Sequence, residues 1–130
     1  MKATELMIGD WVQNQDGSIK GRIVNIDAYK NRVEFGTYTI DTDFVYPIPL
    51  TPEILEKHSF LKVEAIEYPS HSVGISFLYR DTPEGLRIFV QNACVGGPTC
   101  TMIKTCKYVH EVQHMIKMCD IEKEIVLWNQ

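Results

Sequence analysis

The strongest constraint on the fold of this chain comes from two stretches joined by one short turn. In each stretch apolar residues recur at every second position, as in a β-strand. SVGISFLYR at 72–80 and LRIFVQ at 86–91 flank the turn sequence DTPEG at 81–85. Successive side chains of a strand point to opposite faces, so such a pattern buries one face of a sheet. The stretches therefore predict an antiparallel hairpin whose inward residues are Val73, Ile75, Phe77, Tyr79, Leu86, Ile88 and Val90.

The first fifty residues also have the character of strands separated by turns. Asp16-Gly17 follows LMIGDWVQ at 6–13 and supplies the backbone conformation that a hairpin turn needs. Pro47 and Pro49 favour an edge position for the segment that they interrupt, because proline cannot donate to a central ladder. We therefore expect residues 1–50 to form a small, strongly bent antiparallel barrel of the Src-homology-3 type.

The period-two pattern also predicts which side chains of this N-terminal part face inward. GRIVNIDA at 21–28 and RVEFGTYTI at 32–40 each alternate apolar and polar positions. The inward set is expected to comprise Val24, Ile26 and Ala28 in the first stretch, and Val33 and Phe35 in the second.

Two helices are expected in the remaining chain, at 51–60 and at 105–119. Thr51 is a capping residue, Pro52 fits the first helical position, and Ile54, Leu55 and Phe60 are expected inward. Thr105 is expected to cap the longer helix, and the apolar pattern of this helix predicts that one face packs onto a sheet. IVLW at 125–128 is expected to form a last strand. The fold class is α+β, and the inward residues of the longer helix are Val109, Val112, Ile116 and Cys119.

Length and composition restrict the class of protein. A chain of 130 residues with 45% hydrophobic residues predicts a single folded domain, residues 1–130. Its net charge of −4 disfavours non-specific binding to a phosphate backbone. We expect a cytoplasmic protein with no membrane association, because no signal peptide and no long apolar span is present.

One motif suggests a zinc hydrolase. His110, Glu111 and His114 have the H-E-x-x-H spacing, which places two imidazoles on one helical face with a carboxylate as general base. A third ligand would have to come from Glu122 or Glu124, or from Asp120 in the longer form of the motif, where Lys117 replaces the usual glycine. On a helical wheel both histidines lie on the polar face, so we favour a solvent-facing pair.

A second motif suggests a zinc-stabilised nucleic-acid binder. Cys94, Cys100, Cys106 and His110 resemble the three-cysteine, one-histidine fingers that bind single-stranded RNA. Thiolates and an imidazole suit tetrahedral zinc, and the intervening Tyr108 could stack on a base. The surroundings lack the density of arginine and aromatic residues that RNA binding normally requires, so we favour buried free thiols.

Three segments together resemble a family of small uncharacterised proteins from Bacteroides and its relatives, many of them associated with phages or other mobile elements. They are ELMIGDWV at 5–12, YPIPLTPEILEKHSF at 46–60 and KYVHEVQHMIKMCDIEKEIVL at 107–127. Ser59 stands where the family pattern has glycine. The resemblance implies a bacterial or phage origin, transfers no catalytic residue, and assigns the histidine motif to a family helix.

From these observations we predict a non-enzymatic binding or adaptor domain without a catalytic residue, a metal or a cofactor. Its expected partner is a protein or a nucleic acid, and a homo-oligomer is possible. The zinc-stabilised nucleic-acid binder is the alternative, and the H-E-x-x-H hydrolase is the less favoured third hypothesis.

Overall fold

The computed structural model describes residues 1–65 and 74–127 of the chain. Val73 of the expected hairpin and Trp128 of the expected last strand lie outside the described residues. The chain divides into two compact units. Unit 1 comprises Met1–Pro49 and Tyr108–His110, and unit 2 comprises Leu50–Lys107 and Glu111–Gln130. The single-domain interpretation stays a prediction.

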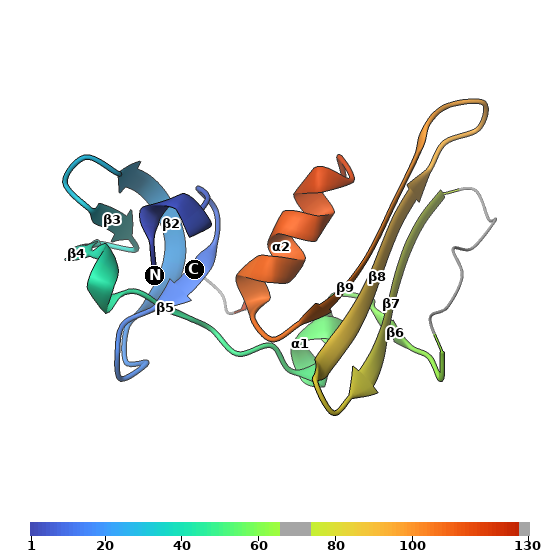
Figure 1. Ribbon diagram of the computed structural model, residues 1–130, viewed down its shortest axis with the longest axis horizontal. Coiled ribbons are helices and arrows are strands. Elements are labelled where there is room, and N and C mark those ends of the chain that lie inside the picture. The colour runs from blue at the N-terminus through green and yellow to red at the C-terminus, as the bar shows by residue number, and fades with distance from the viewer. Residues whose placement is uncertain (66–73, 128–130) are drawn as a thin grey trace. The chain divides into compact units, whose positions relative to one another are not determined.

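Unit 1 contains a five-stranded antiparallel sheet in the order β4-β3-β2-β1-β5 (Figure 1). The predicted turn joins β1 to β2, where the Ser18 N–H donates to the Asp16 carboxylate and Gly17 has a φ of 74°. The elements, with η for a 3-10 helix, are η1 Ala3–Glu5, β1 Trp11–Gln13, β2 Lys20–Asp27, β3 Arg32–Phe35, β4 Tyr38–Asp41, η2 Thr42–Phe44 and β5 Tyr46–Pro47.

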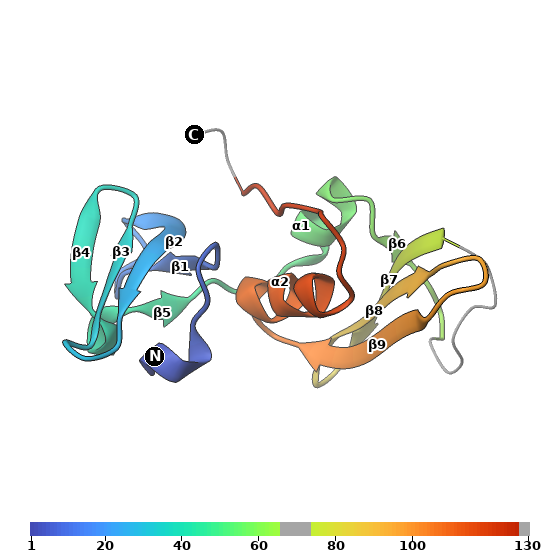
Figure 2. The same cartoon turned by 90° about the horizontal axis from the view of Figure 1, so that it is seen from above.

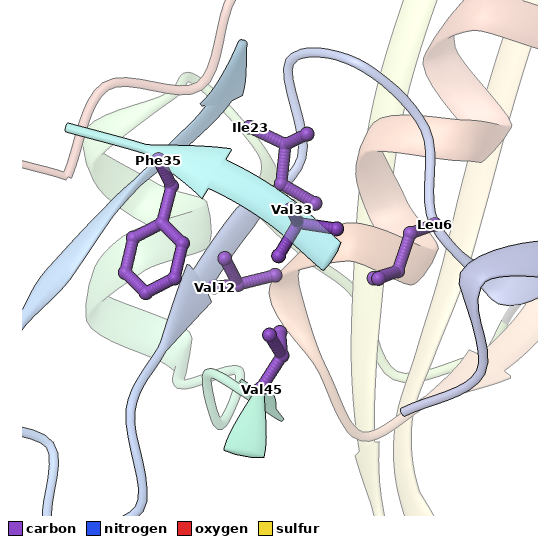
Figure 3. Packing of buried hydrophobic residues seen from close by; sticks show 6 residues of the cluster. All are labelled: Leu6, Val12, Ile23, Val33, Phe35 and Val45. Atoms are coloured by element: carbon purple, nitrogen blue, oxygen red, sulfur yellow. The ribbon is translucent and has the colours of Figure 1, made fainter. Parts of the chain in front are cut away.

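The core of unit 1 confirms the inward positions predicted in β3, and Ile26 of β2 packs against it, but the predictions for Val24 and Ala28 were wrong. Val24 in β2 is 57% exposed and Ala28, just after the strand, is exposed, whereas Ile23 is 1% exposed. The register against β3 shifts between Ile23 and Asn25, so Val24 is an extra residue in a bulge and Ile23 turns inward. Six buried side chains form this core (Figure 3): Leu6, Val12, Ile23, Val33, Phe35 and Val45.

The expected barrel is not confirmed, because neither sheet closes on itself in the described part of the chain. The sheet of unit 1 is open, with β4 at one edge and β5 at the other. The edge position predicted from Pro47 and Pro49 is confirmed, since β1 is the one described strand that β5 pairs with.

Unit 2 contains a four-stranded sheet in the order β6-β7-β8-β9 (Figure 2). Its strands are β6 Leu61–Lys62, β7 Gly74–Thr82, β8 Gly85–Ala93 and β9 Thr99–Cys106. The predicted hairpin is confirmed as β7 and β8, with Phe77 opposite Val90 and Tyr79 opposite Ile88. Ile75 is the exception among the described inward positions, because it is 54% exposed.

Helix α1, Pro52–Lys57, begins as the sequence predicts. The Thr51 hydroxyl accepts the Ile54 N–H at 3.3 Å, and Leu55 and Phe60 are buried. The helix ends at Ser59, which has a φ of 69°. The Phe60 N–H donates to the Leu55 carbonyl and the Ser59 N–H to the Glu56 carbonyl, which is a Schellman motif.

Two predictions near the C-terminus were wrong. The second helix, α2, spans Val109–Met118, so Thr105 is not its cap but lies in β9. The stretch TCTMIKTC is rich in β-branched residues and pairs with β8 over its whole length, so Thr105 and Cys106 belong to the strand. Residues 121–127 contain no strand, so the expected last strand is absent from its described part.

The packing predicted for α2 is confirmed. Val109, Val112, Ile116 and Cys119 are each at most 1% exposed. Within unit 2 the helix covers one face of the sheet (Figure 2), where the Cys106 thiol lies 3.6 Å from the Met115 sulfur. Phe60 after α1 packs against Phe77 on the same sheet, with ring centroids 4.9 Å apart.

Candidate functional sites

The H-E-x-x-H residues lie on α2, but His110 is not on an exposed face. Its side chain is 9% exposed, and that of His114 is partly buried. The prediction of a solvent-facing pair was therefore wrong for His110. The rings of Tyr108 and His110 stack with centroids 6.0 Å apart and 16° between their planes, which shields the imidazole.

Glu111, the general base of the hydrolase hypothesis, is occupied by structural interactions at the start of α2. Its Oε1 accepts the Lys107 N–H at 2.9 Å, and its Oε2 lies 3.2 Å from the Lys104 Nζ. The carboxylate thereby ties the first turn of α2 to the residue that follows β9. The arrangement explains the glutamate at this position without catalysis.

The candidate third ligand Asp120 also has a structural role. It has a φ of 54° and ends α2, with its N–H donating to the Lys117 carbonyl and the Ile121 N–H donating to the Ile116 carbonyl. This is a second Schellman motif. Among the described residues, no group of three or more His, Cys, Asp or Glu side chains gathers as a metal site.

The four residues of the zinc-finger hypothesis are not brought together. Cys100 and Cys106 lie on one strand, β9, and six residues of extended chain span about 20 Å. Two ligands of one tetrahedral zinc lie within a few ångströms of each other. Cys106 is buried instead, and burial together with the nearby Glu111 carboxylate raises the pKa of its thiol to about 12.

Three cysteines line one hollow that the sequence motifs do not indicate. Cys94, Cys100 and Cys119 line a shallow hollow of about 210 Å³ at the end of unit 2 where β8, β9 and α2 meet. Sequence reasoning assigned Cys119 to the core face of the helix and grouped Cys100 with Cys106. The pairing of β8 with β9 brings these cysteines to one end of the sheet, and this pairing was not predicted from the sequence.

Two hydrogen-bonded links hold unit 2 together around α1. The Tyr79 hydroxyl donates to the Glu56 carboxylate at 2.5 Å, and this bond and burial raise the pKa of Tyr79 to about 12. His58 joins α1 to the C-terminal segment, with Nδ1 2.7 Å from the Ile54 carbonyl and Nε2 accepting the Val126 N–H at 2.9 Å. Because Nε2 accepts, Nδ1 carries the proton and donates.

The outer edge of β9 is the longest sheet edge in the described part of the chain. This strand has eight residues and, among the strands that the structure describes, pairs only with β8. The other edge strands are shorter: β4 has four residues, and β5 and β6 have two each. Residues 99–103 of β9 carry no charge and no proline.

Comparisons with protein-family models, with curated proteins and with solved structures found no match for this chain. In the described residues, none of the helices has the length and apolar character needed to cross a bilayer.

Proposed function

We propose that this chain is a non-enzymatic protein-binding domain that takes an extended segment of a partner protein as an additional strand along β9. The observation that carries the proposal is the length of this edge strand, whose outer edge no described strand covers. An edge strand presents a row of backbone N–H and C=O groups that another strand can pair with.

The contrast with the other edges supports this assignment. β5 contains Pro47 and is followed by Pro49, and β4 ends at Asp41. Prolines, short length and charges are the devices that prevent pairing at an edge. On β9 the single charged residue is Lys104, and it is engaged with Glu111 of α2.

Charge favours a protein over a nucleic acid as the partner. The chain has a net charge of −4, and 17 acidic residues outnumber 13 basic ones. Binding to a phosphate backbone draws its affinity from clustered Lys and Arg side chains. Backbone pairing along a strand does not need them.

Two finer predictions accompany the proposal. The 3-10 helix η2 before β5 and the return of β5 to pair with β1 support the Src-homology-3-like interpretation of unit 1. The association with bacterial or phage mobile elements rests on the sequence resemblance alone, and cytoplasmic localisation rests on the sequence reading.

The test is selection of a random-peptide library on the purified chain, followed by affinity measurement with a Thr101→Lys variant. Lysine in the middle of an edge strand is a natural guard against pairing, so binding should be lost. Tyr29→Lys, at a position in unit 1 that is 96% exposed, is the matched control and should bind normally. Hydrogen exchange should show new protection of the β9 amides on binding.

Three results would contradict the proposal. Selected peptides could bind Thr101→Lys as tightly as the parent chain. Sedimentation could show a dimer of the parent chain that the Thr101→Lys substitution dissociates, which would mean that β9 pairs with a second copy. Single-stranded RNA could bind with an affinity that falls steeply with salt, which would favour the nucleic-acid class.

A further inference from the structure

The thiols of Cys100 and Cys119 lie together between β9 and the end of α2. The Cys100 Sγ donates to the Met118 carbonyl at 3.6 Å, and Met118 directly precedes Cys119. The Cys119 Sγ lies 3.9 Å from the Val90 carbonyl. Both sulfur atoms are therefore held at the same end of the sheet.

A third residue fixes this juxtaposition. Asn92 is the cross-strand partner of Cys100, and its side-chain N–H donates to the Cys119 carbonyl at 2.8 Å. The Schellman motif at Asp120 stops the helix at this point, so the Cys119 backbone is anchored from both sides. Burial and a hydrogen bond with Cys100 raise the pKa of the Cys119 thiol to about 12.

The two thiols differ in their access to solvent. Cys119 is 1% exposed, whereas Cys100 is partly exposed and lines the hollow together with the exposed Cys94. An oxidant in solution meets a partly exposed thiol before a buried one with a raised pKa. Cys119 is then placed to react with the oxidised form of its neighbour.

We propose that Cys100 and Cys119 are a redox-sensitive pair, which a hydroperoxide converts to an intramolecular disulfide that joins β9 to the end of α2. This inference does not rest on the proposed function.

The reaction has two steps when the oxidant is hydrogen peroxide. The Cys100 sulfur attacks the O–O bond, an S–O bond forms, water leaves, and Cys100 becomes a sulfenic acid. The Cys119 sulfur then attacks the Cys100 sulfur, the S–S bond forms, and the hydroxyl leaves with the Cys119 proton as a second water. Two thiols lose two electrons in total, and one peroxide becomes two waters.

The test is oxidation of the folded chain by stoichiometric hydrogen peroxide, followed by intact mass and tryptic peptide mapping. Trypsin places Cys94 and Cys100 in the peptide 88–104 and Cys119 in the peptide 118–123. We expect a cross-link between these peptides that a thiol reductant reverses. The link should be lost in Cys100→Ser and kept in Cys94→Ser, the matched control from the same hollow.

Several outcomes would overturn the inference. One is a cross-link that persists in Cys100→Ser and disappears in Cys94→Ser. Another is oxidation of Cys100 to higher acids while Cys119 stays reduced, and a third is a disulfide only between two chains. Because Cys119 is buried, the conclusion uses the Cys100 and Cys94 variants, whose near-ultraviolet circular dichroism should match that of the parent chain.

Discussion

The imidazole of His58 joins the end of α1 to Val126, 68 residues further along the chain. One ring nitrogen donates to the Ile54 carbonyl and the other accepts the Val126 N–H, so a single buried side chain anchors the C-terminal segment to unit 2. The two bonds give His58 a structural role.

Replacing His58 with alanine should lower the free energy of unfolding by about 1–3 kcal/mol, because two hydrogen bonds of a buried group are lost. Amide exchange at Val126 should accelerate more than exchange in β8. Lys57→Ala, at the adjacent exposed position, is the control and should change stability little. Unchanged exchange at Val126 in His58→Ala would show that other contacts hold the segment.

Tyr79 predicts a pH dependence at the alkaline end. Its pKa is raised from 10.0 to about 12, chiefly by the bond to Glu56, so the folded state holds the phenol proton more tightly than the unfolded state. The stabilisation is complete below pH 10 and disappears as the pH rises towards 12. Chemical denaturation across this range should show a steeper loss of stability for the parent chain than for Tyr79→Phe. An equal dependence of the unfolding free energy on pH in the two proteins would contradict the role given to the Tyr79 hydroxyl.

Ser59 predicts a stabilising substitution. Its φ of 69° at the end of α1 costs energy for any residue with a Cβ, and the resemblance places glycine at this position. Ser59→Gly should raise the free energy of unfolding by roughly 0.5–1 kcal/mol, after the larger entropy of unfolded glycine is subtracted. Ser18→Gly, at an exposed turn, is the control and should not stabilise the chain. A lower melting temperature in Ser59→Gly would refute the explanation.

Sequence patterns predicted the parts of this fold in which local chemistry and burial agree. The cap at Thr51, the β7–β8 hairpin and the inward residues of α2 belong to this class. The bulge at Val24 could not be predicted, because a one-residue insertion changes the face of a strand without altering its composition. β9 was not predicted, because its assignment depends on pairing with β8, which is a relationship between two separate strands.

The dependence on long-range pairing also explains why the cysteine pair was not predicted. Spacing along the chain grouped Cys94, Cys100, Cys106 and His110, whereas β9 separates Cys100 from Cys106 by its whole length. Cys100 meets Cys119 through the return of the chain by α2, a long-range relationship that no local motif encodes.

Val112 tests the packing of α2. Its side chain is fully buried, and an aspartate there would be an unpaired buried charge. Val112→Asp should cost about 3–5 kcal/mol and unfold the chain at moderate temperature. Met118→Asp, on the same helix at a position that is 69% exposed, is the matched control and should remain folded. A melting temperature of Val112→Asp equal to that of the parent chain would refute the packing.

Metal removal tests both zinc hypotheses together. Glu111 is tied to Lys104 and Lys107, and two thiols of the finger motif, Cys100 and Cys106, lie near opposite ends of β9, so neither motif is assembled around a common point. Protein purified without a chelator or a histidine tag should contain less than stoichiometric zinc by elemental mass spectrometry. Its melting temperature should be the same with a chelator or with added zinc, because folding would otherwise be linked to binding. One zinc per chain that is lost in His110→Ala would restore the metal hypotheses, and Cys100→Ser would then separate the finger from the hydrolase.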